Sequence, residues 1–175
     1  APVPPTATVT NGLSYGPLAV TMRAGHAFAG WRTAADGAGD PVTPATVVTA
    51  IANHTLYAHW TPNPPLTVTF DPQGGSAPVP PTTAVTNGLP YGPLATTARS
   101  GYTFAGWWTG AAGTGGEITP GSPVTVTVDH TLFAKWTPNA VMTVTFDAQG
   151  GSAPVPAATN VTFDAPYGPL PATAR

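Results

Sequence analysis

The sequence predicts a mainly β fold of tandem small modules in an end-to-end array, with very little helix. Three observations predict this class. Motifs recur at a constant spacing of 76 positions, and short apolar segments alternate with the period of two that a strand requires. In addition, 23 Pro and 20 Gly interrupt the chain too often for long helices. Because a fixed spacing decides the architecture of a repeat protein, the repeat is the first feature to establish.

The repeat is clearest in the motif YGPL, which opens at Tyr15, Tyr91 and Tyr167, each 76 positions from the next copy. The segments PNPP and PNAV separate a strand that ends in Trp from the next TVTF strand, so the module boundaries are placed there. The chain therefore begins and ends inside a repeat. The predicted organisation is a module lacking its first strand at 1–61, a linker at 62–65, a complete module at 66–137, a linker at 138–141 and the N-terminal half of a third module at 142–175.

The opening strand of a module is the segment LTVTF at Leu66–Phe70, copied as MTVTF at Met142–Phe146. In each copy the apolar residues share one face and the threonines take the other. The segment VTVTVD at Val124–Asp129 also alternates, and HTLFAKW at His130–Trp136 ends the module. All four segments are predicted to be half-buried strands.

The segment GYTFAGW needs an irregular strand. Phe104 and Trp107 are three positions apart and cannot share a face of a regular strand, so a bulge near Gly106 is expected to re-aim the tryptophan. The same argument applies to the first copy, at 28–31. With these faces assigned, the expected structural core is Phe28, Trp31, Leu56, Trp60, Val68, Phe70, Phe104, Trp107, Val126, Leu132, Trp136, Val144 and Phe146.

Composition excludes several classes of partner. Only 7% of the residues are charged and the formal net charge is −2, so no basic patch exists to bind nucleic acid or an anionic bilayer. No apolar run approaches the length of a membrane span, and membrane insertion of this segment is not expected. Cysteine is absent, which excludes disulfides and thiolate metal ligands.

The titratable residues give no sign of a catalytic or metal site. Two of the four histidines change identity between copies, because His26 corresponds to Tyr102 and His59 to Lys135; His54 and His130 recur where a turn enters a strand. We interpret all four as structural or solvent-facing. Lys135 is the only lysine and Glu117 the only glutamate, but alternation points Lys135 outward, which disfavours an intramolecular cross-link.

Two aspartates, Asp71 and Asp147, stand alone before PQGG and AQGG and lack the additional carboxylates of a calcium site, so we interpret them as turn caps. No Ser-His-Asp or Cys-His arrangement is present. The sequence therefore predicts no cofactor, no metal and no enzymatic activity.

These motifs resemble the Listeria-Bacteroides repeat family, also described as the internalin B-type repeat. The matching pattern is a VTFD strand followed by a Gly pair, then YGPL, then GYTFAGWW at 101–108 and HTLFAKW at 130–136. The resemblance implies a compact β-grasp-like module found in tandem in secreted and surface-anchored bacterial proteins, often adhesins. It implies no catalytic activity.

The expected function is structural: a repeat segment of an extracellular bacterial fibre, filament or surface-protein stalk, located outside the cell or at its surface. Its expected partners are neighbouring repeats or identical subunits, giving a homo-oligomer or polymer. The alternative is an adhesin module in which an exposed Trp108 contacts a host or surface glycan or protein; its counterpart in the first copy is Arg32.

The two ends of the chain suggest how such an assembly forms. Residues 1–61 lack the strand equivalent to Leu66–Phe70, and residues 142–175 carry it. One subunit is therefore expected to complete the next in a head-to-tail contact. The alternative is that the chain is a window of a longer continuous array.

Overall fold

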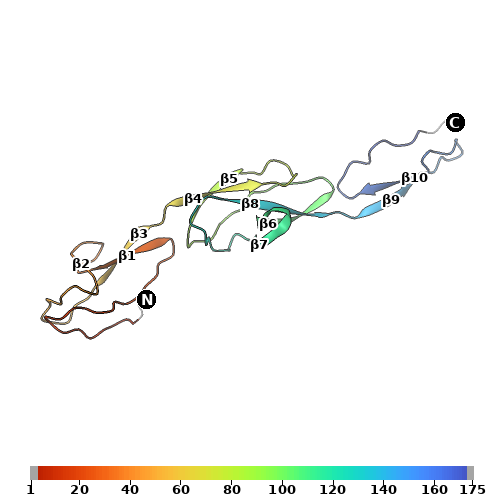
Figure 1. Cartoon of the computed structure of the whole chain (residues 1–175). Helices are drawn as coiled ribbons and strands as arrows, with labels where there is room; N and C mark the ends of the chain where they lie inside the picture. The colour runs from red at the N-terminus through yellow and green to blue at the C-terminus, as the bar shows by residue number, and fades with distance from the viewer. Residues whose placement is uncertain (1–3, 173–175) are drawn as a thin grey trace. The chain divides into compact units, whose positions relative to one another are not determined.

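The mainly β class is confirmed by the computed structural model of the chain, which describes residues 4–172 (Figure 1). The one helix in this range is a single 3-10 turn, η1 (Ala111–Gly113). The strands are β1 (His26–Arg32), β2 (Pro41–Val42), β3 (Tyr57–Pro62), β4 (Pro65–Asp71), β5 (Thr82–Thr86), β6 (Tyr102–Gly110), β7 (Thr114–Ile118), β8 (His130–Pro138), β9 (Val141–Thr145) and β10 (Ala158–Thr162).

The chain folds into two compact units that interleave in sequence. Unit 1 contains the residues up to Leu66 together with Val85–Tyr91 and Pro123–Thr127. Unit 2 contains Thr67–Ala84, Gly92–Ser122 and the residues from Val128 onward.

Unit 1 holds a three-stranded antiparallel sheet in the order β2-β1-β3. The register of β1 against β3 shifts between Phe28 and Gly30, and Gly30 has a φ of 110°, which an L side chain rarely adopts. After this bulge Trp31 points inward and is only 8% exposed. Its Nε1 donates a hydrogen bond to the carbonyl of Ala19 at 3.0 Å.

Unit 2 is organised by a five-stranded sheet in the order β5-β4-β8-β6-β7. The two central strands, β4 and β8, are parallel, while β6 is antiparallel to both β8 and β7. Along β4 the apolar residues are buried and the threonines are exposed, so the alternation predicted for this strand is confirmed. The β-grasp description stays an expectation. A separate two-stranded sheet pairs β9 with β10.

The bulge predicted near Gly106 is also confirmed. The register of β6 against β8 shifts between Phe104 and Trp107, and Gly106 has a φ of 98°. Trp107 is 1% exposed, and its Nε1 donates to the carbonyl of Ala95 at 2.8 Å. This bond repeats the one made by Trp31, 76 positions earlier.

The strand predicted at Val124–Asp129 is wrong: these residues form no strand, and Val126, expected in the core, is 36% exposed. A loop uses the backbone groups that a strand partner would need. Val124 donates its N–H to the carbonyl of Leu89, and the Asn87 side chain donates to the carbonyl of Val126, both at 2.9 Å. Alternation alone therefore misassigned a segment that satisfies its hydrogen bonds with a turn.

Two aromatic residues expected in the core are also exposed, Phe28 at 40% and Phe104 at 37%. Phe104 packs edge-on against Trp107 and Trp136, with ring centroids 5.5 and 5.3 Å apart, and the remainder of its ring faces solvent. Phe28 makes the corresponding contacts with Trp31 and Trp60. Of the other residues assigned to the core, those that are buried are Trp31, Val68, Phe70, Trp107 and Leu132, and those that are half-buried are Leu56, Trp60, Trp136, Val144 and Phe146.

Candidate functional site

The arrangement that recurs most closely from repeat to repeat is a junction between the end of one module and the beginning of the next. In unit 1 the junction is made by Asn63, which lies between β3 and β4. Its backbone N–H donates to the carbonyl of Gly25 at 2.9 Å, and its Nδ2 donates to the carbonyl of Asn87 at 3.0 Å. This one residue, through its backbone N–H and its side-chain amide, thus joins a turn that precedes β1 to a loop that follows β5.

Unit 2 contains the same junction, 76 positions later. Asn139 lies between β8 and β9, its N–H donates to the carbonyl of Gly101 at 2.9 Å, and its Nδ2 donates to the carbonyl of Phe163 at 3.0 Å. Unit 2 adds a bond from the Gly101 N–H to the carbonyl of Asp164 at 2.9 Å. The chemistry that the two junctions share therefore lies in one asparagine per repeat and in backbone carbonyls. In unit 2 the Thr103 hydroxyl also donates to Oδ1 of Asn139 at 2.7 Å, and its counterpart in the first copy is Ala27.

A junction of this kind is made without any charged group. An asparagine amide donates two hydrogen bonds and satisfies backbone carbonyls that a flexible linker would leave to solvent. The two asparagines stand in the PNPP and PNAV segments, for which the sequence predicted only a linker. The recurrence of asparagine at the repeat spacing could have indicated this role from the sequence. A linker with no packing role does not need the same residue in both copies.

The histidines do not converge. His54 places its Nε2 2.6 Å from the Oη of Tyr15, and its Nδ1 lies 3.2 Å from the carbonyl of Ala52. His26 and His130 each contact the backbone carbonyl two residues earlier through Nδ1.

The fourth histidine, His59, packs directly over a glycine. A Cβ added to Gly37 would lie 2.7 Å from the ring of His59, and a Cβ added to Gly113 would lie 2.5 Å from the stem of Lys135. Both copies therefore pack a long side chain over the same glycine. The two copies therefore share the packing of a long side chain over this glycine, and they do not share an imidazole ring.

The aspartates cap turns, as predicted. Asp71 accepts the N–H of Gln73 at 2.9 Å, and Asp147 accepts the N–H of Gln149 at the same distance. Both glutamines have positive φ, 48° and 45°. Such Asx turns use the carboxylate to direct the chain into the following Gly pair.

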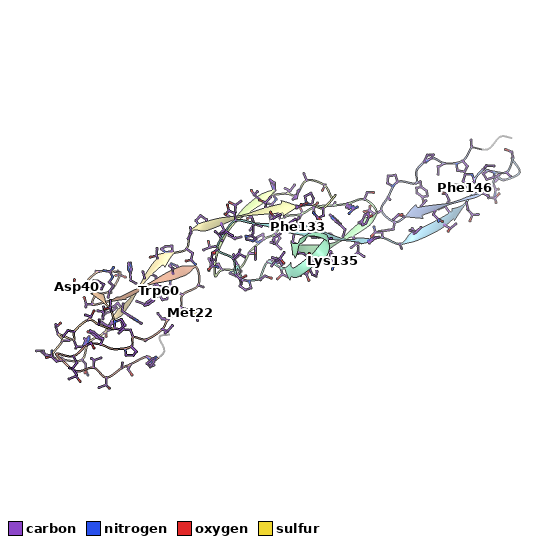
Figure 2. All side chains as sticks on the ribbon, in the orientation of Figure 1. Met22, Asp40, Trp60, Phe133, Lys135 and Phe146 are labelled. Carbon is purple, nitrogen blue, oxygen red and sulfur yellow. The ribbon has the colours of Figure 1, made fainter. Side chains whose placement is uncertain are left out.

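The ring of Trp108 is partly covered by other residues of the chain. The residue is half-buried, its Nε1 donates to the carbonyl of Ala105 at 3.2 Å, and the Lys135 ammonium lies 4.0 Å from the ring centroid. Lys135 extends from β8 in the middle part of the chain (Figure 2). A stacking ligand would have to displace it.

Within residues 4–172 no group of three or more His, Cys, Asp or Glu lies together as a metal site would require. In the same range, no helix has the length and apolar character needed to cross a membrane.

Comparison with known proteins identifies the repeat. Residues 3–59 and 67–135 match the Listeria-Bacteroides repeat domain. The "Putative Gly-rich membrane protein" of Evansella cellulosilytica is 37% identical over 139 residues, which cover 74% of this chain and 16% of that protein. No solved structure matches the chain significantly. Since the two matched segments cover most of the sequence, the chain belongs to the Listeria-Bacteroides repeat domain family.

Proposed function

We propose that the chain is a structural segment of an extracellular bacterial fibre, filament or surface-protein stalk, held together by repeat–repeat contacts and by head-to-tail strand complementation. The observation that supports this best is the junction, which is built twice from Asn63 and Asn139 with nearly identical distances. A module that fixes its neighbour through the same bonds each time suits an array.

The composition supports the same role. A free soluble domain normally carries roughly 25–35% charged residues on its surface, whereas this chain has 7% overall. Faces that pack against other copies do not need that charge. A location at the cell surface agrees with the repeat family and with the relative from Evansella cellulosilytica, which is named a membrane protein.

The adhesin alternative is less well supported. It needs an exposed aromatic platform, and Trp108 is half-buried beneath Lys135. A glycan array probed with the chain separates the two roles, because specific binding that is lost in Trp108→Ala would favour the adhesin.

The direct test is immuno-electron microscopy of the producing cells with an antibody raised against the chain. We expect label along filaments or stalks outside the cell envelope. Label confined to the cell interior would contradict the proposal.

A further inference from the structure

The middle repeat, residues 66–137, has chain on both sides of it, so the strands that receive a pull along the chain can be identified. Two residues separate β3 from β4, and two separate β8 from β9. A force applied along the chain therefore enters this repeat at the start of β4 and leaves it at the end of β8.

These two strands are neighbours, and they are parallel (Figure 1). Val68–Asp71 of β4 pairs with residues 130–133 of β8 in a register of four residue pairs. Because the strands run in the same direction, the start of β4 and the end of β8 lie at opposite ends of the pair. A pull on those two ends slides one strand along the other. It therefore loads the hydrogen bonds of the ladder together and not one after another.

The pair lies at the centre of the five-stranded sheet. In the order β5-β4-β8-β6-β7, β4 is flanked by β5 and β8 is flanked by β6. The apolar side chains of the pair are packed in the core: Val68, Phe70 and Leu132 are 0%, 4% and 0% exposed. The ring of Phe70 also packs on Trp107, with centroids 4.7 Å apart. Sliding β4 along β8 would therefore disrupt close packing as well as hydrogen bonds.

Two side chains extend the link beyond the ladder, one at each end. Before β8, Oδ1 of Asp129 accepts the backbone N–H of Thr67 at 2.7 Å. Near the end of β8, Nε1 of Trp136 donates to the carbonyl of Pro72, which follows β4, at 2.8 Å. Each bond joins the β4 segment to the β8 segment, so sliding loads both bonds together with the ladder.

We infer that β4 and β8, with the Asp129 and Trp136 bonds at the two ends, form a mechanical clamp that keeps the repeat folded under tension. This inference deepens the proposed function and rests on it, because a fibre or stalk outside the cell is pulled along its chain. Resistance to forced unfolding depends on the rate of unfolding and not on equilibrium stability. The chain contains no cysteine, so no disulfide shares the load.

The test pulls single molecules of the 175-residue chain through two introduced cysteines, which are unique because the chain has none of its own. Pro64→Cys combined with Ala140→Cys applies shear, since both positions are exposed and flank the clamp. Pro64→Cys combined with Val128→Cys is the matched control. Val128 is 66% exposed and lies just before β8, so this pull peels the same ladder apart from one end.

We expect shear to require roughly two to four times the unfolding force of peeling, because the load is shared across four paired positions instead of falling on one at a time. The gain in length identifies the event in shear. The 76 positions from 64 to 140 extend to at most about 250–270 Å.

A pair of tryptophan variants separates the clamp from general stability. Trp136→Phe removes the bond to Pro72 but keeps an aromatic ring. Its matched control is Trp108→Phe, which loses a bond to the carbonyl of Ala105 within β6. Trp136→Phe should lower the shear force by roughly a sixth, since it removes one of six linked positions, four in the ladder and two at its ends. Its peeling force should not change, because peeling starts at the opposite end of the ladder, and Trp108→Phe should leave the shear force unchanged.

Equal unfolding forces in shear and in peeling overturn the inference. An equal loss of shear force in Trp136→Phe and Trp108→Phe also overturns it, as does a loss in Trp136→Phe that is as large in peeling as in shear. If the two forces are equal while the antibody labels extracellular filaments, the clamp is wrong and the proposed function stands. If shear needs the larger force while the label is confined to the cell interior, the clamp stands and the proposed function is wrong.

Discussion

Gly75 shows how one position without a side chain fixes the turn after β4. A Cβ added there would lie 2.5 Å from Cζ2 of Trp136 and 3.1 Å from the carbonyl oxygen of Ala98. The indole cannot retreat freely, because its Nε1 donates to the carbonyl of Pro72 at 2.8 Å. A small residue is therefore required for the tryptophan to reach the turn.

Gly75→Ala is expected to lower the free energy of unfolding by about 1–3 kcal/mol, the usual cost of overpacking. The matched control is Gly116→Ala, because a Cβ at Gly116 meets nothing within 4 Å. That variant should be unchanged or more stable by up to about 1 kcal/mol, since alanine restricts the unfolded chain. Urea denaturation compares the two, and an equal loss in both would contradict the packing argument.

The adjacent tryptophans of β6 offer a second comparison. Trp107 is 1% exposed and Trp108 is half-buried. Trp107→Ala should cost about 3–5 kcal/mol, as for other buried aromatic truncations, and Trp108→Ala less than half as much. Chemical denaturation measures both, and a larger loss for Trp108 would show that the bulge at Gly106 does not set their burial.

At the scale of the elements, the sequence predicted well where one local pattern also matched the tertiary contacts. The alternation in Leu66–Phe70 predicted β4, and the spacing of Phe104 and Trp107 predicted the bulge in β6. It failed at Val124–Asp129, because the backbone groups of that segment bond to residues 87 and 89. Hydrogen bonds to residues so far away in the sequence cannot be predicted from the alternation of apolar and polar residues.

The candidate site was harder to predict than the strands. An asparagine between two prolines or beside one is typical of a turn, so local chemistry favoured a linker at Asn63 and Asn139. Their role depends on carbonyls 24 residues further along the chain.

The YGPL turn carries a prediction on pH. Tyr91 is 7% exposed, and burial raises its pKa above the usual value of 10.0. The folded state then holds its proton at a pH where the unfolded state has lost it, so stability is fully present below pH 10 and falls as the pH rises above it. Tyr91→Phe should weaken this alkaline decline.

Urea denaturation at neutral pH and above pH 10 measures the effect. Tyr167→Phe is the matched control, because Tyr167 opens the same motif and is 60% exposed. An alkaline decline in Tyr91→Phe as steep as in the wild type would show that Tyr91 does not cause it.

At the scale of the whole molecule, the stability of a repeat array is approximately a sum of terms within repeats and terms between neighbours. This chain makes the same neighbour contact twice. The Asn63 junction lies in unit 1 and the Asn139 junction in unit 2. The two contacts share no hydrogen-bonding partner, so they should contribute independently.

Asn63→Ala and Asn139→Ala are each expected to lower the free energy of unfolding by about 1 kcal/mol, the net contribution of a typical hydrogen bond. The two losses should be similar, because Asn63→Ala removes a part-buried bond to Asn87 whereas Asn139→Ala removes two exposed bonds, one to Phe163 and one from Thr103. Asn53→Ala, at an exposed position outside the strands, is the matched control and should change little. In the double variant the two losses should add within about 0.5 kcal/mol. Denaturation of the four variants beside the wild type provides these values.

Single losses no greater than that of Asn53→Ala would show that the asparagines do not stabilise the array. Losses that fail to add would show that the two junctions are energetically coupled, which contradicts independent contributions from separate neighbour contacts.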